Sequence, residues 1–489
     1  MSFESNGSQS SQTQTIPLSD FLSTQDDSHF IWDDANREMS EAWLAPVEEA
    51  LLESNKHKVF HHCSKEYLKM PSPFVQHGPE LGDSGSTIVY KVTPPEGYAY
   101  RRPLALKVIV CKENSRPPGP DSKARSDALK EVKTMSSLRH PHIVAYVASF
   151  EDYCIQTREI KRRPHGKAHA MVSGVVNQRI KKHVLAIAMY PPAQCNLHTF
   201  MDEVFQSPRE ADWILPHLHT YFGCLSQAVA YLHRRNVQIR HKDIKPENIV
   251  IDDFGLPVLT DFGLSKHFET GQYSEGPTPK TLKYADPDAM QEGRRDAHSD
   301  IFSLGCVFLE IATVLLGKPP RFAEEQLAGD AHSMSSSGTG SEFKYSESLH
   351  NLDGYLLTLA LLARDLAAAD PSREPSVKAV LAILPDIRRM MDAVSTHRPD
   401  AHQLYPWFRH LYDVHDTPGP CPNCEEERRS GRAIPSRSGS RSPTLNRGGT
   451  IVGGSSQGLV RRGTAASSVT NFMAAQVGAL LVDGELDSD

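Results

Sequence analysis

The sequence reads HKDIKPEN at residues 241–248, and DFG follows at residues 261–263. The first stretch combines a carboxylate, a lysine and an amide, and the second adds another carboxylate. Phosphoryl transfer depends mainly on positioning and on charge neutralisation, for which these side chains are suited. A tight loop would place Asp243, Lys245 and Asn248 around one phosphate. The tripeptide DFG alone would be a weak indication, since isolated charges are usually ordinary solvated side chains.

Two further motifs lie upstream in a fixed order. LALK at residues 104–107 lies in a predicted strand, and Glu131 lies in a helix predicted over residues 126–138. The order and spacing resemble those of eukaryotic Ser/Thr protein kinases over about residues 75–415. The HKDIKPEN variant resembles kinases of filamentous fungi. The resemblance implies an α+β, two-lobed protein kinase fold with a small β-rich N-lobe, a larger helical C-lobe and disordered tails.

The resemblance also implies an activity, transfer of the γ-phosphate of MgATP to Ser or Thr hydroxyls of protein substrates. Asp243 would accept the proton of the substrate hydroxyl, and Lys245 would stabilise the γ-phosphate. Lys107 would contact the α- and β-phosphates and form a salt bridge with Glu131.

Ligands for ATP and Mg²⁺ follow from the same resemblance. Asn248 and Asp261 would hold the magnesium ion through oxygen atoms. The residues expected to bind the nucleotide are Leu81, Gly82, Gly85, Val89, Ala105, Lys107, Met189, Tyr190, Asn248 and Asp261.

The nucleotide site departs from the family pattern in two places. Counted back from Val89, the glycine-rich loop keeps only the first of three expected glycines, because Ser84 and Thr87 occupy the other positions. Their side chains crowd the approach of the backbone to phosphates. In the hinge, near residues 189–192, Met189 is the predicted gatekeeper and Pro192 falls where a backbone N–H usually meets adenine. Either the hinge bulges or one adenine hydrogen bond is missing, because proline has no N–H.

These departures favour a rival interpretation, a catalytically weak or inactive pseudokinase that acts as a binding scaffold. The intact catalytic side chains oppose it, because a scaffold needs none of them. They are Lys107, Glu131, Asp243, Lys245, Asn248 and Asp261.

The activation segment shows its own departures. Lys242 replaces the arginine that usually binds an activation-loop phosphate, and lysine lacks the bidentate fork, so the sequence argues against control by phosphorylation there. Asp288 replaces the glutamate of Ala-Pro-Glu, and Arg398, rather than Arg373, is its predicted buried partner. The phosphorylation candidates are Ser274, Thr278 and Thr281, of which Thr281 is better explained as the substrate-platform threonine preceding Tyr284.

Asp300 begins a predicted helix and resembles the buried aspartate that braces the catalytic-loop backbone in this family. The alternative is an acid stabilised by the helix dipole alone. A stacked hydrophobic column is predicted as well, although simple core packing would also explain its first two members. It comprises Met135, Tyr146, His241 and Phe262.

The chain divides into three predicted regions. Residues 1–74 are a disordered and partly helical extension, with apolar residues at helical spacing over 43–51. Residues 75–415 are the kinase domain, which carries a basic insertion at 154–183 and a polar one at 328–342. A solvated loop is favoured for the basic insertion over a nucleic-acid patch or a nuclear localisation signal. Residues 416–489 are an Arg/Ser/Gly-rich tail predicted to be disordered.

The composition is that of an ordinary intracellular protein. The net charge of −7 gives no reason to expect bulk nucleic-acid binding, and eight cysteines in 489 residues do not form a disulfide framework. Neither a signal peptide nor an apolar run of roughly 18 residues is present. We therefore expect a cytoplasmic or nuclear protein that acts on protein substrates away from membranes, with any regulatory partners at the tails. Tethering to RNA through the basic segments is a lesser alternative.

CPNC at residues 421–424 is a lone CxxC motif. A zinc knuckle needs four ligands, and the nearest candidates, His410 and His415, are not well spaced. A plain polar turn is favoured, and metal binding stays open.

Overall fold

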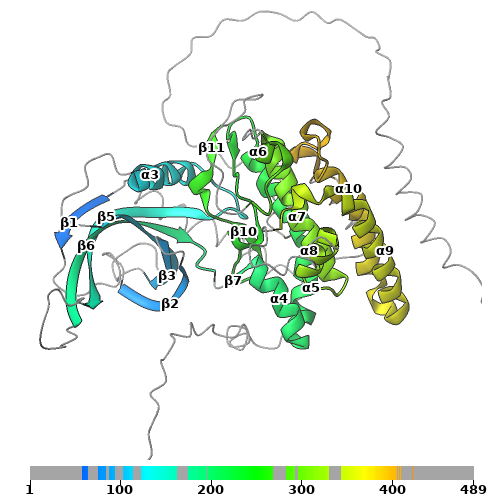
Figure 1. Cartoon of the computed structure of the whole chain (residues 1–489), viewed down its shortest axis with the longest axis horizontal. Coiled ribbons are helices and arrows are strands. Elements are labelled where there is room, and N and C mark those ends of the chain that lie inside the picture. The colour runs from blue at the N-terminus through cyan, green and yellow to red at the C-terminus, as the bar shows by residue number, and fades with distance from the viewer. Residues whose placement is uncertain are drawn as a thin grey trace, which may run out of the picture.

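The computed structural model divides into a β-rich lobe and a helical lobe (Figure 1). It describes residues 58–63, 75–83, 87–93, 103–113, 123–161, 175–193, 195–267, 282–291, 296–329 and 343–404, together with Pro406, Phe408, Cys421 and Cys424. This is the α+β, two-lobed architecture that the sequence predicts.

The N-lobe is built on a six-stranded sheet in the order β1-β5-β6-β4-β3-β2. Its strands are β1 (Lys58–Cys63), β2 (Val75–Asp83), β3 (Thr87–Thr93), β4 (Leu104–Glu113), β5 (Ala145–Lys161) and β6 (Val175–Tyr190). Leu104, Leu106 and Ile187 are at most 1% exposed, so the central strands β4 and β6 carry the core of this lobe. Helix α3 (Lys123–Ser136) packs against β4 and β5. The predicted strands between residues 81 and 110, the strand at 144–150 and the helix over 126–138 are confirmed.

Two predictions about this lobe are wrong. Residues 58–63 belong to the supposed disordered or helical extension, yet they form β1, which runs parallel to β5. The basic insertion at 154–183 is largely not a loop, because β5 continues to Lys161 and β6 starts at Val175. Among the described residues of the insertion, the two strands pair in one antiparallel ladder from Cys154 with Lys182 to Lys161 with Val175. A dense run of basic residues hides the apolar alternation by which strands are recognised in a sequence.

The C-lobe is helical, and its core surrounds one apolar helix. Its helices are α4 (Leu197–Gln206), α5 (Pro208–Leu232), α6 (Pro287–Gln291), α7 (Ala297–Leu315), α8 (Arg321–Ala328), α9 (Leu352–Ala369) and α10 (Glu374–Met390). Helix α7 packs against both α5 and α10. Helix α7 is long and apolar enough to cross a membrane, since an 18-residue stretch of it has a mean hydropathy of 1.4. However, 89% of that stretch is buried inside the lobe. Its apolarity is therefore that of a core helix.

Short strands position the two motifs at the junction of the lobes. HKDIKPEN lies between β8 (Ile239–Arg240) and β9 (Ile249–Ile251). DFG lies between β10 (Pro257–Leu259) and β11 (Lys266–His267). Because β8 pairs with β11 and β9 pairs with β10, the two motifs are brought side by side.

Several predictions lie outside the described residues. They are the helix at 43–51, the loop residues Ser84, Gly85 and Ser86, the sites Ser274, Thr278 and Thr281, nearly all of the insertion at 328–342, and the tail at 416–489 apart from Cys421 and Cys424.

Candidate active site

The backbone of the HKDIKPEN loop is held by Asp300, at the start of α7. Its carboxylate accepts the backbone N–H groups of His241 and Lys242, each at 2.8 Å, and lies 2.9 Å from Nε2 of His233. Lys242 has a φ of 72°, a left-handed conformation that costs roughly 1–2 kcal/mol for a residue with a Cβ. Burial opposes ionisation of Asp300, but the contacts with His233 and Lys242 outweigh it and keep its pKa below the usual range. The predicted bracing role is confirmed, and it works through direct hydrogen bonds.

Three side chains of the loop converge as the sequence predicts. The amide of Asn248 donates to the main-chain oxygen and to Oδ2 of Asp243, both at 2.8 Å. The ammonium group of Lys245 lies 2.9 Å from the same Oδ2. A turn of 3-10 helix over Pro246–Asn248 brings residue 248 back toward residue 243. The loop thus gathers a carboxylate, a cation and an amide whose oxygen faces no partner within the loop.

Lys107 joins both lobes through two carboxylates. Its Nζ atom lies 2.7 Å from Oε1 of Glu131 on α3 and 2.8 Å from Oδ1 of Asp261 in DFG. Burial alone would lower the pKa of Lys107, but the charges of Glu131 and then Asp261 outweigh it and raise the pKa above its usual value. The nearby charge of Lys107 in turn lowers the pKa of Asp261. Burial raises the pKa of Glu131, although the charge of Lys107 opposes that shift. Lys107 and Asp261 are therefore charged at neutral pH.

The nucleotide side of the cleft is only partly described. Ala105 on β4 and Met189 on β6 are direct partners in the sheet, and both are buried. Tyr190 ends β6 and is also buried. Gly82 pairs with Val89 across β2 and β3, and Leu81 and Val89 are half-buried. The expected nucleotide residues of the N-lobe thus share one sheet, apart from Gly85, which lies outside the described residues, whereas Asn248 and Asp261 belong to the HKDIKPEN loop and to DFG.

The predicted hydrophobic column is fully buried. Met135, Tyr146, His241 and Phe262 are at most 2% exposed. The rings of His241 and Phe262 meet edge to face with centroids 4.8 Å apart, which links the HKDIKPEN loop to DFG.

Comparison with known proteins gives the family. A family model described as protein kinase domain matches residues 76–383, well over half of the chain. This chain belongs to the protein kinase family.

Its relatives include Ser/Thr kinases of distant organisms. They are the serine/threonine-protein kinase fused of Drosophila melanogaster (24% identical), mitogen-activated protein kinase kinase kinase A of Dictyostelium discoideum (27%) and a probable serine/threonine-protein kinase CHK1 homolog of Encephalitozoon cuniculi (31%). The matched segments cover 49%, 43% and 36% of this kinase, and 24%, 18% and 34% of those relatives, respectively. The similarity thus spans about a third or less of each relative.

The kinase pairs Arg398 with a different carboxylate from the predicted one. Nη1 of Arg398 lies 3.0 Å from Oδ2 of Asp286, and both side chains are at most 1% exposed. Asp288, the predicted partner, is only half-buried in the first turn of α6. Asp288 is one methylene shorter than the glutamate that it replaces in the Ala-Pro-Glu motif. The side chain of Asp286, in contrast, already lies in the core beside Arg398. The choice of Arg398 over Arg373 is confirmed, because Arg373 donates to the main-chain oxygen of Leu315 instead.

Sequence reasoning missed Glu310, a carboxylate at the centre of the C-lobe. One oxygen of Glu310 accepts the hydroxyls of Tyr284 at 2.9 Å and Tyr345 at 2.8 Å, and Lys283 lies 3.0 Å away. Glu310 is fully buried in α7. It thereby anchors the end of the activation segment at residues 283 and 284. The signal in the sequence is a single charge inside the apolar run VFLEIATVLL at 307–316.

Proposed function

We propose that this kinase transfers the γ-phosphate of MgATP to Ser or Thr hydroxyls of protein substrates. The observation that carries the proposal is the ammonium group of Lys107, which lies within 2.8 Å of both Glu131 and Asp261. These three groups come from β4, α3 and the DFG segment, so their meeting requires that the two lobes be arranged for catalysis. A salt bridge of this kind is what a phosphate-binding lysine needs to keep its charge and its orientation.

The residues present suit MgATP. Asn248 directs its amide nitrogen at Asp243, which leaves the amide oxygen for a cation, and the side chain of Asp261 is 46% exposed at the cleft. Amide and carboxylate oxygens are ligands that Mg²⁺ prefers. When bound, magnesium supplies neutralisation of the phosphate charge.

The side chains of the protein divide the remaining tasks. Asp243 accepts the proton of the incoming hydroxyl, and its hydrogen bonds to Asn248 and Lys245 fix the direction in which its carboxylate points. Lys245 places positive charge beside the transferred group, and Lys107 does so beside the α- and β-phosphates. Catalysis of this type rests on fixed charges rather than on a covalent intermediate.

The pseudokinase alternative rests on the substituted glycine-rich loop and on Pro192. Neither feature removes a charged group from the site, while a scaffold would not require the contacts among Lys107, Glu131 and Asp261. We also propose a relationship to kinases of filamentous fungi, supported by the HKDIKPEN form of the loop.

The test is phosphate transfer by the purified full chain to itself and to a generic basic protein, followed by phosphoamino-acid analysis. Asp243→Asn should lower the rate by about 10²–10⁴-fold, because it removes the proton acceptor and keeps the shape. Asp253→Asn, an exposed acid of the same lobe, is the matched control and should retain the wild-type rate. Phosphoserine and phosphothreonine formed only with Asp243 intact are the expected result. A wild-type chain that binds MgATP but transfers no phosphate would overturn the proposal in favour of the scaffold.

A further inference from the structure

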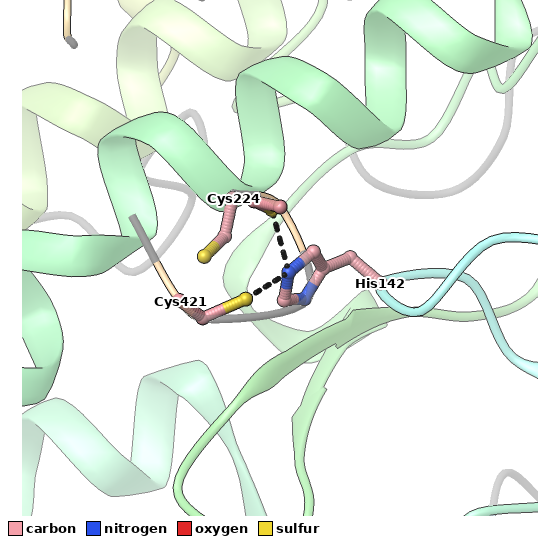
Figure 2. A group of neighbouring side chains, drawn as sticks. His142, Cys224 and Cys421 are labelled. Carbon is pink, nitrogen blue, oxygen red and sulfur yellow. Dashed lines mark hydrogen bonds between the residues drawn. The ribbon is translucent and has the colours of Figure 1, made fainter. Parts of the chain in front are cut away.

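Four soft-donor side chains meet at a point away from the catalytic cleft. His142, Cys224, Cys421 and Cys424 bring one ligand atom each to positions that all lie within 4.8 Å of one another. Figure 2 shows the imidazole of His142 facing the sulfur of Cys421, with Cys224 beside them. All four residues are fully buried. The prediction that Cys421 and Cys424 belong to a plain polar turn is therefore wrong, because both side chains are buried.

The four residues come from three separate parts of the chain. His142 lies between α3 and β5, and Cys224 lies inside α5. Cys421 and Cys424 follow the last helix of the C-lobe and lie 279 and 282 positions beyond His142. Their convergence is a product of the fold rather than of local sequence.

The imidazole of His142 is oriented as a ligand. Its Nδ1 atom lies 2.7 Å from the main-chain oxygen of Pro257, so Nδ1 carries the proton and donates it there. The lone pair of Nε2 therefore points the other way, at Cys421 and Cys424, whose sulfurs both lie 3.1 Å from it. A carbonyl that fixes the tautomer of a histidine in this manner is the usual outer support of a metal-binding imidazole.

Two simpler explanations fit less well. A small apolar cluster would explain why the cysteines are buried. It would, however, leave the Nε2 lone pair of His142 facing weak thiol donors. Among the described residues, only Leu256 adds apolar packing around the three cysteines. A disulfide would explain the proximity of two sulfurs, yet all three cysteines are free thiols.

We propose that His142, Cys224, Cys421 and Cys424 bind one Zn²⁺ ion as a closed, structural site. Three thiolates and one imidazole form a tetrahedral donor set that soft-ligand sites use for zinc. With metal–ligand bonds of about 2.0–2.3 Å, tetrahedral geometry places the donors roughly 3.5–3.8 Å apart. The separations of Nε2 from the sulfurs of Cys421 and Cys424 are both 3.1 Å and no two donors are more than 4.8 Å apart, so modest side-chain shifts admit the ion. Binding releases the thiol protons to solvent and changes no oxidation state.

The site would fasten the C-terminal segment to the structure that supports DFG. The main-chain oxygen of His142 accepts a hydrogen bond from the N–H of Leu259 at 2.9 Å. The main-chain oxygen of Leu259 in turn accepts one from the N–H of Val144 at 3.0 Å. Leu259 ends β10, two residues before Asp261. A metal held by His142 therefore stabilises the strand that presents Asp261, and it does so only when residues 421 and 424 are in place.

The first test is the metal content of the full chain, purified under reducing conditions with Zn²⁺ supplied and then passed through a desalting column. One zinc per chain is expected, with iron and copper measured in the same sample. The double variant Cys421→Ser, Cys424→Ser should lose the zinc. Cys195→Ser, which changes a cysteine outside the cluster, is the matched control and should keep it.

A second measurement uses wild-type protein, so that the proposal can still be tested if the double variant fails to fold. Wild-type protein is exchanged into Co²⁺, and the intense visible bands of tetrahedral cobalt with thiolate-to-metal charge transfer are expected. A thiol-blocking mercurial should then release the metal as the three cluster thiols react, which is counted against the thiols that the double variant titrates. Substoichiometric metal in the reduced wild type, zinc retained by the double variant, or an octahedral cobalt spectrum would each overturn the proposal. An intact mass that shows a Cys421–Cys424 disulfide in the freshly purified chain would do so too.

Discussion

The guanidinium group of Arg398 forms its buried ion pair with Asp286, the residue that precedes α6, at an Nη1–Oδ2 distance of 3.0 Å. The same guanidinium donates to the main-chain oxygens of His298 and Asp392 and lies over the ring of Phe302. Ser299 adds a hydrogen bond to Asp286. The pair thus ties the end of the activation segment to α7 and to the last part of the C-lobe.

Asp286→Asn should destabilise the kinase by about 3 kcal/mol or more, because it leaves the charge of Arg398 buried without compensation. Asp288→Asn should change the free energy of unfolding by no more than about 0.5 kcal/mol, since that carboxylate is half-buried in the described part of the chain and outside the pair. Urea denaturation of the two variants measures the difference. Equal losses, or the larger loss at Asp288, would mean that the ion pair is assigned to the wrong residue.

Asp300→Asn tests whether this carboxylate acts through hydrogen bonds or through the helix dipole. An amide has one acceptor oxygen, so one of the backbone N–H groups of His241 and Lys242 loses its partner, at about 3 kcal/mol of stability. Misplacement of the catalytic loop should also lower the rate per folded molecule by about ten- to a hundredfold. Asp296→Asn is the control, because Asp296 caps the same helix and asparagine caps equally well. Similar effects of both changes would support the dipole explanation.

Pro192→Ala would restore an N–H group in the hinge. If that group donates to adenine, the KM for ATP should fall about fivefold, which corresponds to about 1 kcal/mol for one neutral hydrogen bond, while kcat stays constant. Initial rates at varied ATP concentration give both constants. Pro371→Ala, at an exposed proline of the C-lobe, controls for loss of a proline ring. An unchanged or higher KM would show that the hinge meets adenine through other groups.

His219 should make the stability of the kinase sensitive to acid. Burial, and then the charge of Arg373, lowers its pKa from the ordinary 6.5 to about 4. As the pH falls, the unfolded chain binds this proton first, so stability is lost between about pH 6.5 and pH 4. Between pH 7 and pH 5 the loss should be about 2 kcal/mol.

His219→Gln keeps a partner for Ser376, which lies 2.6 Å from Nε2 of His219, and should remove that part of the pH dependence. The measurement is the free energy of unfolding of both proteins across this pH range. His350→Gln, at an exposed histidine, serves as the control. Parallel curves for wild type and His219→Gln would contradict the assignment.

Much of the fold and of the central site could be predicted, for reasons that particular residues make clear. The run of β-branched and aliphatic residues around Lys107 and the helical spacing around Glu131 identify their elements, and the loop spacing from Asp243 to Asn248 fixes their proximity. The partner of Arg398 could not be predicted, because it depends on where α6 begins. Glu310 required knowledge of burial, and Cys224 becomes a neighbour of Cys421 only after the whole C-lobe has folded.

The paired strands β5 and β6 extend past the last residue of β4, where Glu113 pairs with Lys182. Beyond that point, among the described strands, the two bond only to each other, from Ile155 with Lys181 to Lys161 with Val175. A two-stranded ribbon is marginally stable by itself, so its amide hydrogens should exchange with solvent far faster than those next to Lys107. The ribbon can thus melt and re-form as a unit while the register that positions Lys107 stays intact.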